Sequence, residues 1–277
     1  MTVQSRVLEL EELETDRFAA PHPEDDPEGW NVIFSGQLLA QMIMAADSVF
    51  AGKLDVKSIQ AIFSRAGNYD SPLELRTETT HAGRLFGSTT VTAYQGERLL
   101  SRGLILGSAD EEDLVRHGPK APEVPAPDSL AADPKAQCFP GAETRRVPST
   151  EVSATAEGAP GLDFWVRYPG GAPSVAIAQA ILAWSQPGEF IGLAMQPHAD
   201  VMSIEDAHKH LSTGVIAHTI HFQERFDIGD WLLVSLGGSV ASRGRVYGEG
   251  RVFDRAGRLV STFSQDSMLK AATGGKL

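Results

Sequence analysis

The feature of this sequence that most constrains its fold is an internal repeat at a constant spacing. Segments with the alternating or branched residues of β-strands lie at 56–63, 73–80, 86–94 and 98–106, and again at 215–222, 231–240, 245–253 and 258–264. The two sets align at an offset of 159 residues, with Phe63 on Phe222 and Leu73 on Leu232, until one residue is added in the last turn. Self-similarity at a fixed spacing indicates two copies of one domain.

Each set of strands follows a helix that is apolar on nearly every side. The first predicted helix spans 36–51, GQLLAQMIMAADSVFA, and the second spans 174–185, SVAIAQAILAWS. A helix of this kind must be covered all round, and a meander with one apolar face can wrap it. We therefore predict an α+β fold, a tandem double hotdog in which each half is an antiparallel sheet wrapped around a central helix. Ser35 is the predicted N-cap of the first helix, and Gly52 its stop.

The repeats are separated by a segment rich in proline. Seven of the 16 prolines lie between Pro119 and Pro148. Because proline cannot donate to a sheet ladder, we expect this stretch to stay out of the sheets. The predicted organisation is an N-terminal hotdog domain at 1–108, a connection at 109–160 and a C-terminal hotdog domain at 161–277.

Charge and composition exclude several classes of partner. The chain has 24 Lys and Arg against 36 Asp and Glu, a formal charge of -12, which repels nucleic acid and anionic membranes. No window approaches the ~18 apolar residues of a membrane span, and the N-terminus is acidic where a secretory signal is apolar. We expect a cytoplasmic protein with no nucleic-acid or membrane partner. The single cysteine, Cys138, excludes an internal disulfide and is interpreted as an ordinary free thiol.

Short motifs occur along both halves in a specific order. They are Phe63-Ser64-Arg65-Ala66-Gly67, Trp165-Val166-Arg167, Ala194-Met195-Gln196-Pro197-His198, Asp230-Trp231-Leu232-Leu233 and Ser261-Thr262-Phe263-Ser264-Gln265-Asp266. Together they resemble the acyl-CoA thioesterase II family of double-hotdog enzymes over most of the chain except the Pro-rich connection. The resemblance implies hydrolysis of fatty acyl-CoA to a free acid and CoA, with acyl-CoA or CoA as the ligand and no metal or redox cofactor. It also implies a water nucleophile oriented by an Asp, a Thr and a Gln.

Only one of these three catalytic residues is present in its place. Gln265 matches the glutamine, whereas the threonine position, counted back without a gap, holds Val215. The aspartate position falls on Pro187, or on Gln186 with one gap. The side chains of Val215, Pro187 and Gln186 cannot take a proton from water. Glu189 is the predicted replacement carboxylate, with Gln186 orienting the water.

A replacement for the lost hydroxyl is also available in the sequence. Thr213 and Thr219 are an even number of residues from Val215, so they share its face of a strand. Either could stand in for the threonine if the register is shifted.

Four further residues are predicted to bind substrate. Ser35, Gly36 and Gln37 open the first helix, where they could form a simple cap or present backbone N–H groups to a thioester carbonyl. Arg84, whose position recurs as Arg243, could meet CoA phosphates or be an ordinary turn arginine.

The histidines do not have the spacing of a metal site. His208, His210, His218 and His221 lie without nearby cysteine and without an HExxH pattern, so no metal site is predicted.

Three functions fit these residues. The first is an acyl-CoA thioesterase with a partly rebuilt site. The second is a non-catalytic acyl-CoA-binding or scaffold protein that lost the base. The third is a hydratase or dehydratase that uses His22 beside Asp25. A homodimer or higher homo-oligomer is possible, because hotdog domains generally pair through their sheets.

Overall fold

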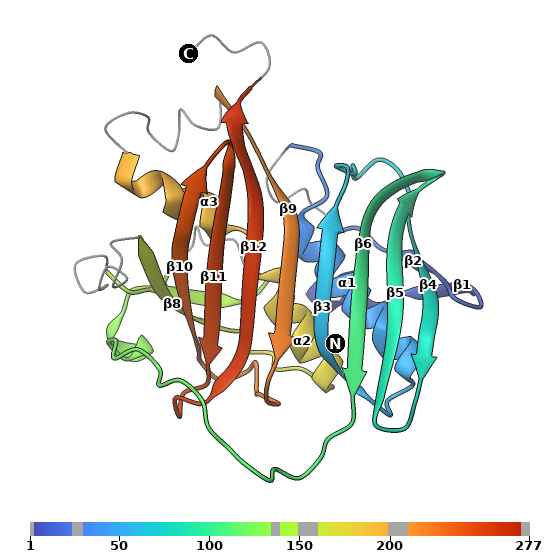
Figure 1. Cartoon of the computed structure of the whole chain (residues 1–277), viewed down its shortest axis with the longest axis horizontal. Coiled ribbons are helices and arrows are strands. Elements are labelled where there is room, and N and C mark those ends of the chain that lie inside the picture. The colour runs from blue at the N-terminus through green and yellow to red at the C-terminus, as the bar shows by residue number, and fades with distance from the viewer. Residues whose placement is uncertain (1–2, 24–29, 134–138, 149–159, 199–209, 273–277) are drawn as a thin grey trace.

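The strands form one antiparallel sheet of twelve, as a computed structural model shows (Figure 1). The structure describes residues 3–23, 30–133, 139–148, 160–198 and 210–272. Along the sheet the order is β1-β2-β4-β5-β6-β3-β9-β12-β11-β10-β8-β7. The first six strands are β1 Glu11–Glu14, β2 Arg17–Ala20, β3 Asp55–Phe63, β4 Leu73–Ala82, β5 Phe86–Gln95 and β6 Arg98–Ser108. The other six are β7 Glu143–Arg146, β8 Gly161–Arg167, β9 Leu211–Phe222, β10 Leu232–Ser242, β11 Arg245–Phe253 and β12 Leu259–Ala271.

The helices lie together on one face of this sheet (Figure 1). They are α1 Ser35–Phe50, α2 Val175–Trp184 and α3 Glu189–Met195, with short 3-10 turns at Val3–Leu8, Pro127–Ser129 and Gln196–His198. Met42 in α1 is fully buried and Ile181 in α2 is 2% exposed, so the two predicted central helices are confirmed as buried. Among the described residues, no helix is both long and apolar enough to cross a bilayer.

The predicted repeat is confirmed by the strand boundaries. β4 and β10 begin at Leu73 and Leu232, and β3 and β9 end at Phe63 and Phe222, each pair 159 residues apart. The helices do not keep this offset, because the segment between α2 and β9 is longer than the one between α1 and β3 and contains α3. No helix was predicted there.

The halves are joined by β3 and β9. These strands pair antiparallel, with Ile59 opposite Ile220, and both residues are fully buried. Because the pairing is antiparallel, equivalent hairpin turns of the two halves point to opposite ends of the sheet.

The core of the first half depends on glycines in β6. A Cβ at Gly103 would lie 3.0 Å from the sulfur of Met42, and one at Gly107 would lie 2.6 Å from the ring of Phe50. The two side chains of α1 therefore fill the space that glycine leaves free, and each contributes about 1.5–3 kcal/mol by burial.

The two helices begin differently. The cap residue of α1 is Phe34, without a side-chain hydrogen bond, so the prediction that Ser35 caps it is wrong. Ser174 does cap α2, because its hydroxyl accepts a hydrogen bond from the N–H of Ile177 at 3.2 Å. Ala51, with φ of 52°, is the left-handed residue that ends α1, followed by Gly52.

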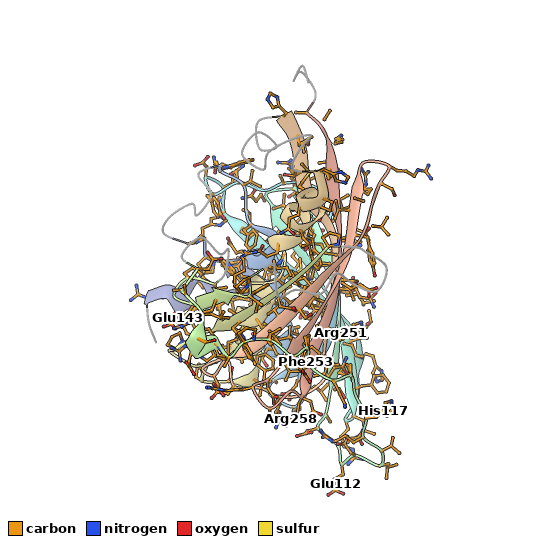
Figure 2. All side chains as sticks on the ribbon, turned by 90° about the vertical axis from the view of Figure 1, so that its left-hand side faces the viewer. Glu112, His117, Glu143, Arg251, Phe253 and Arg258 are labelled. Atoms are coloured by element: carbon orange, nitrogen blue, oxygen red, sulfur yellow. The ribbon has the colours of Figure 1, made fainter. Side chains whose placement is uncertain are left out.

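Part of the connection does enter the sheet, contrary to prediction. β7 carries no proline and pairs with β8 at the edge of the sheet, where Glu143 is labelled in Figure 2. Residues 121–130 of the connection pack against the face of the sheet opposite the helices, where a second buried cluster holds Trp165, Trp231 and Phe253. Phe139 lies on the helix side, and its ring packs 5.3 Å from that of Trp184. Cys138 is outside the described residues, and the division into domains at 108 and 161 stays a prediction.

The close approach of α1 to the end of α2 is testable at Gly36. A Cβ there would lie 2.2 Å from the carbonyl oxygen of Trp184, so backbone must shift to accept it. We predict that Gly36→Ala lowers the free energy of unfolding by about 1–3 kcal/mol, measured by urea denaturation.

Gly192 in α3 is the matched control, since a Cβ there meets nothing within 4 Å. Gly192→Ala should leave stability unchanged or raise it by up to about 1 kcal/mol through helix propensity. Equal effects of the two changes would contradict this account of the helix contact.

Candidate active site

Three elements bring polar side chains together at the end of α2. After α2 the chain turns through Gln186 and Pro187 into α3, which directs Gln186 back toward the sheet. Gln265 lies in β12 directly opposite His218 in β9. Both side chains face the helices. They are buried, whereas the residues next to them along each strand are more exposed and face the other side of the sheet.

Four residues form one hydrogen-bonded group, which we call the buried polar chain: Gln186, His218, Gln265 and Ser267. The Nε2 amide of Gln265 donates to the carbonyl oxygen of Pro187 at 3.1 Å and to Oγ of Ser267 at 2.8 Å. Its Oε1 lies 3.0 Å from Nδ1 of His218. Nε2 of His218 lies 3.3 Å from Oε1 of Gln186. The chain therefore runs continuously from β12 through β9 to the turn after α2.

The buried polar chain is closed to solvent. Gln186 is 2% exposed, His218 and Gln265 are each 1% exposed, and Ser267 is fully buried. The ring of His218 stacks on Phe263, with centroids 5.7 Å apart. Burial lowers the pKa of His218 from 6.5 to about 4, although its hydrogen bond to Gln265 acts in the other direction. His218 is therefore neutral at pH 7.

The structure brings together two of the three predicted catalytic residues, Gln265 and Gln186, and adds His218. From the sequence, His218 was a candidate for metal binding only. Val215 instead pairs with Ser267, beyond an irregularity in the ladder between Asp266 and Ser267. Among the described residues, neither Thr213 nor Thr219 hydrogen-bonds to Gln265, and Thr219 lies on the other face of β9 from His218. His218 could have been identified from the alternation of side chains along β9, but only with knowledge of how β9 pairs with β12.

Glu189 is held elsewhere. Its carboxylate accepts two hydrogen bonds from Arg146, at 3.0 and 3.2 Å, and Arg146 also binds Asp133. No hydrogen bond joins Glu189 to the buried polar chain in the part of the chain that the structure describes. The predicted replacement carboxylate is thus engaged in an ion-pair cluster at the start of α3.

The start of α1 approaches the same region. Gly36 packs against the backbone of Trp184, two residues before Gln186, so the Trp184 carbonyl occupies the space beside this glycine. Gln37 is fully buried but points away, toward Pro21, His22 and Gln41. Asp25, the proposed partner of His22, is outside the described residues. Roles for Ser35, Gly36 and Gln37 in substrate binding stay predictions.

The predicted phosphate contact, Arg84, lies in the β4–β5 turn. Its side chain is exposed, as is that of Arg243 in the β10–β11 turn. Since β3 and β9 run antiparallel, these two turns lie at opposite ends of the sheet (Figure 1). The two arginines therefore cannot serve one phosphate group together.

Metal ligands do not cluster in the described ranges. No group of three or more His, Cys, Asp or Glu side chains within them could hold a metal ion. His208, one of the histidines considered above, is outside these ranges.

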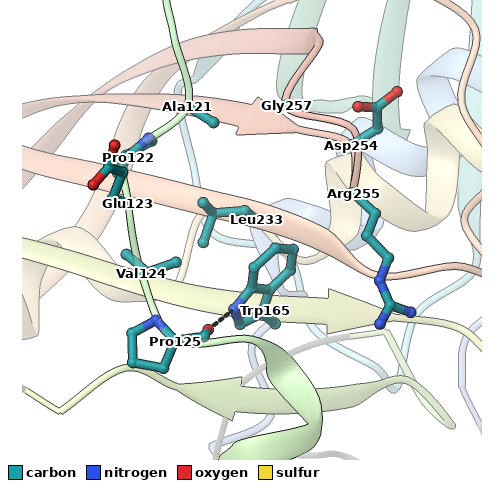
Figure 3. Close-up of a pocket in the computed structure, with 10 residues that line it drawn as sticks. All are labelled: Ala121, Pro122, Glu123, Val124, Pro125, Trp165, Leu233, Asp254, Arg255 and Gly257. Atoms are coloured by element: carbon teal, nitrogen blue, oxygen red, sulfur yellow. Dashed lines mark hydrogen bonds between the residues drawn. The ribbon is translucent and has the colours of Figure 1, made fainter.

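Two surface pockets lie apart from the buried polar chain. One, of about 510 Å³, lies between the connection and the outer face of β8 and β10, where Nε1 of Trp165 donates to the carbonyl of Pro125 at 3.0 Å (Figure 3). A second, of about 380 Å³, shares Asp254 and Arg255 with it. Neither is lined by a member of the buried polar chain.

Family models match both halves of the chain. Residues 26–107 match a model described as the acyl-CoA thioesterase N-terminal domain, and residues 142–268 match one described as acyl-CoA thioesterase. Acyl-CoA thioesterase 2 of Haemophilus influenzae is 24% identical over 95% of this chain and 96% of its own length. Human acyl-coenzyme A thioesterase 8 is 24% identical over 95% of this chain and 88% of its own length.

Solved structures share the fold. An acyl-CoA thioesterase II from Mycobacterium marinum superposes with a TM-score of 0.85 at 22% identity, covering 99% of this chain and 100% of the other. A hot dog fold protein of unknown function from Alicyclobacillus acidocaldarius superposes with a TM-score of 0.78 at 17% identity, with the same coverage. These likenesses confirm the predicted α+β double-hotdog fold.

The burial of neutral His218 predicts a pH-dependent stability. Its pKa in the folded state, about 4, lies below its unfolded value of 6.5, so between these pH values the unfolded chain binds the extra proton. Stability should therefore fall from pH 6.5 to pH 4, by up to about 3 kcal/mol from this group. His218→Gln should remove that share, so urea denaturation at several pH values should give a flatter profile. Parallel pH profiles of the two proteins would refute the assignment.

Proposed function

Because the chain belongs to the acyl-CoA thioesterase II family, we propose that it hydrolyses fatty acyl-CoA to free acid and CoA at the buried polar chain. The proposal rests on the position and the fixed orientation of Gln265. It occupies the position of the glutamine that the family resemblance implies, and its amide is fixed by Pro187 and Ser267. A glutamine held in this way has a single orientation in which to position a reacting group.

Several features support an acyl thioester as the substrate. The buried polar chain lies among the apolar side chains of α2, α3 and the sheet, including Phe190 and Phe263, whose rings are 5.9 Å apart. Such surroundings suit an acyl chain, and they strengthen hydrogen bonds to a polarised thioester carbonyl. The exposed Arg243 at the end of the β10–β11 hairpin is available to the phosphates of CoA, and Arg84 is available at the equivalent turn of the first half.

A second function is favoured by one specific observation. Among the described residues, no carboxylate is hydrogen-bonded to the buried polar chain, and Glu189 is bound to Arg146. A protein with this arrangement could bind acyl-CoA without hydrolysing it, as a non-catalytic binding or scaffold protein. Thermal stabilisation by a non-hydrolysable acyl-CoA analogue, with no thiol released from the corresponding ester, would favour this alternative.

Location and assembly are also part of the proposal. We place the protein in the cytoplasm, where acyl-CoA esters are available to it. Self-association is supported by apolar side chains exposed on the outer face of the first half, where Ile62 is 53% and Leu104 is 51% exposed. Cell fractionation and light scattering would test these two points.

Release of thiol from a series of acyl-CoA esters of increasing chain length tests hydrolysis. Gln265→Ala should lower kcat/KM by about 10²–10⁴-fold, because the site loses the amide that the family resemblance implies for orienting the water. Gln60→Ala is the matched control, since Gln60 is exposed on the outer face of β3. The control should retain its activity, whereas unchanged activity in Gln265→Ala would contradict this site.

A further inference from the structure

The hydrogen bonds of Gln265 determine which way its amide faces. Its nitrogen donates to a backbone carbonyl, which can only accept, and to Ser267. If the amide were turned over, two oxygens would face each other at the carbonyl of Pro187. Oε1 is therefore the atom that faces His218, at 3.0 Å from Nδ1.

This orientation determines the tautomer of His218. An amide oxygen has no hydrogen to give, so Nδ1 must carry the proton that is shared with Gln265. A neutral imidazole carries a single N–H, so Nε2 has a free lone pair. Burial keeps the ring neutral at pH 7, as the lowered pKa shows.

Gln186 lies at the lone pair of Nε2. Its Oε1 is 3.3 Å away, and its own Nε2 is buried without a hydrogen-bond partner. Two acceptors do not bond to each other, and the two ends of an amide have the same shape. Turned over, the Gln186 amide donates to His218. The 3.3 Å between them leaves no room for a water molecule. In the reaction a water therefore takes the place of the amide at Nε2 and directs a proton at the lone pair, with its oxygen within reach of the displaced Gln186 amide.

We propose that His218 is the catalytic base of this site, with Gln265 and Gln186 as its positioning residues. The inference rests on the proposed function. It assigns to β9 the proton acceptor that is missing from the family's aspartate position, where this chain has Pro187 or Gln186.

The reaction then balances with water as the only co-reactant. Nε2 of His218 takes a proton from water as the oxygen forms a bond to the thioester carbon, and the carbonyl electron pair moves to its oxygen. When this oxyanion collapses, the C–S bond breaks and the Nε2 proton passes to the CoA sulfur. The products are a carboxylic acid, which ionises, and free CoA thiol. Through both steps Nδ1–H stays bonded to Gln265.

The surroundings of His218 predict how this base behaves. Its neighbours across the ladders are Ala61 in β3 and Gln265 in β12, and neither is charged. The charged side chains of the elements around it are engaged or turned away: Glu189 in α3 is bound to Arg146, and Asp266 in β12 is exposed on the opposite face. Without a carboxylate at Nδ1, the imidazolium formed during reaction has no charged partner, so hydrolysis should be slow. The acid limb of the pH-rate profile, where protonation of His218 stops the reaction, should lie at low pH.

A comparison of His218→Gln with His221→Gln tests this assignment. His221 lies three residues further along β9 and is only half-buried. We expect kcat/KM to fall at least about 100-fold in His218→Gln and to stay within about twofold in His221→Gln, with thermal unfolding confirming that both fold. Full activity in His218→Gln, or loss in Glu189→Gln alone, would overturn the assignment. A wild-type protein that releases no thiol from any acyl-CoA would instead refute the proposed function itself.

Two further measurements test the geometry directly. Nitrogen-15 NMR of the histidines should show His218 protonated at Nδ1 and unprotonated at Nε2, and the reverse tautomer would refute the base assignment. Gln265→Glu should place a carboxylate at Nδ1 and move the acid limb of the pH-rate profile upward by at least about one pH unit. An unmoved limb in an active variant would show that His218 is not the group that titrates.

Discussion

The structure depends on the pairing of β3 with β9. This ladder turns two six-stranded sheets into one and fixes how the duplicated halves meet, with Ile59 and Ile220 buried at the junction. Two sheets joined at their edges leave their helices side by side on one face, so α1 and α2 cover one another as well as the strands. That contact is close enough to require Gly36 against the backbone of Trp184. The end of α2, and with it Gln186, is therefore positioned by both halves of the molecule.

Sequence patterns predicted the regular part of this fold because burial dictates them. The central helices are apolar all round, since one side meets the sheet and another meets the partner helix. The eight repeat strands alternate because only one face of each meets the helices. The short strands at the two ends of the sheet, β1, β2 and β7, were not predicted. Each is four residues long. Their places in the sheet depend on the pairing of β1 with β2, β2 with β4 and β7 with β8, which a local pattern does not report.

The candidate site was predictable only in part, for a related reason. Gln265 and Gln186 follow from motifs along the chain, but the residue that faces Gln265 depends on the register of β9 against β12. A count without gaps reaches Val215, whereas the ladder places His218 there and has an irregularity next to it. The irregularity adds one residue in β9, so Val215 lies opposite Ser267, on the same face as His218 and one inward-facing pair further along. The count therefore selects a neighbouring side chain that has no polar atom. Register is a tertiary property, set by Phe222 and Ile220 packing into the core.

The chemistry of the site follows from the cost of burying charge. A carboxylate fully enclosed at the end of α2 would lose several kcal/mol of hydration, and a cation would be needed to offset that loss. This chain instead encloses two amides, a hydroxyl and an imidazole, all of which are neutral at pH 7. Such a group is less costly to bury, and all of it is hydrogen-bonded except one end of the Gln186 amide. The same neutrality leaves the imidazole a weak base, so the arrangement that stabilises the closed site also limits how fast it can remove a proton from water.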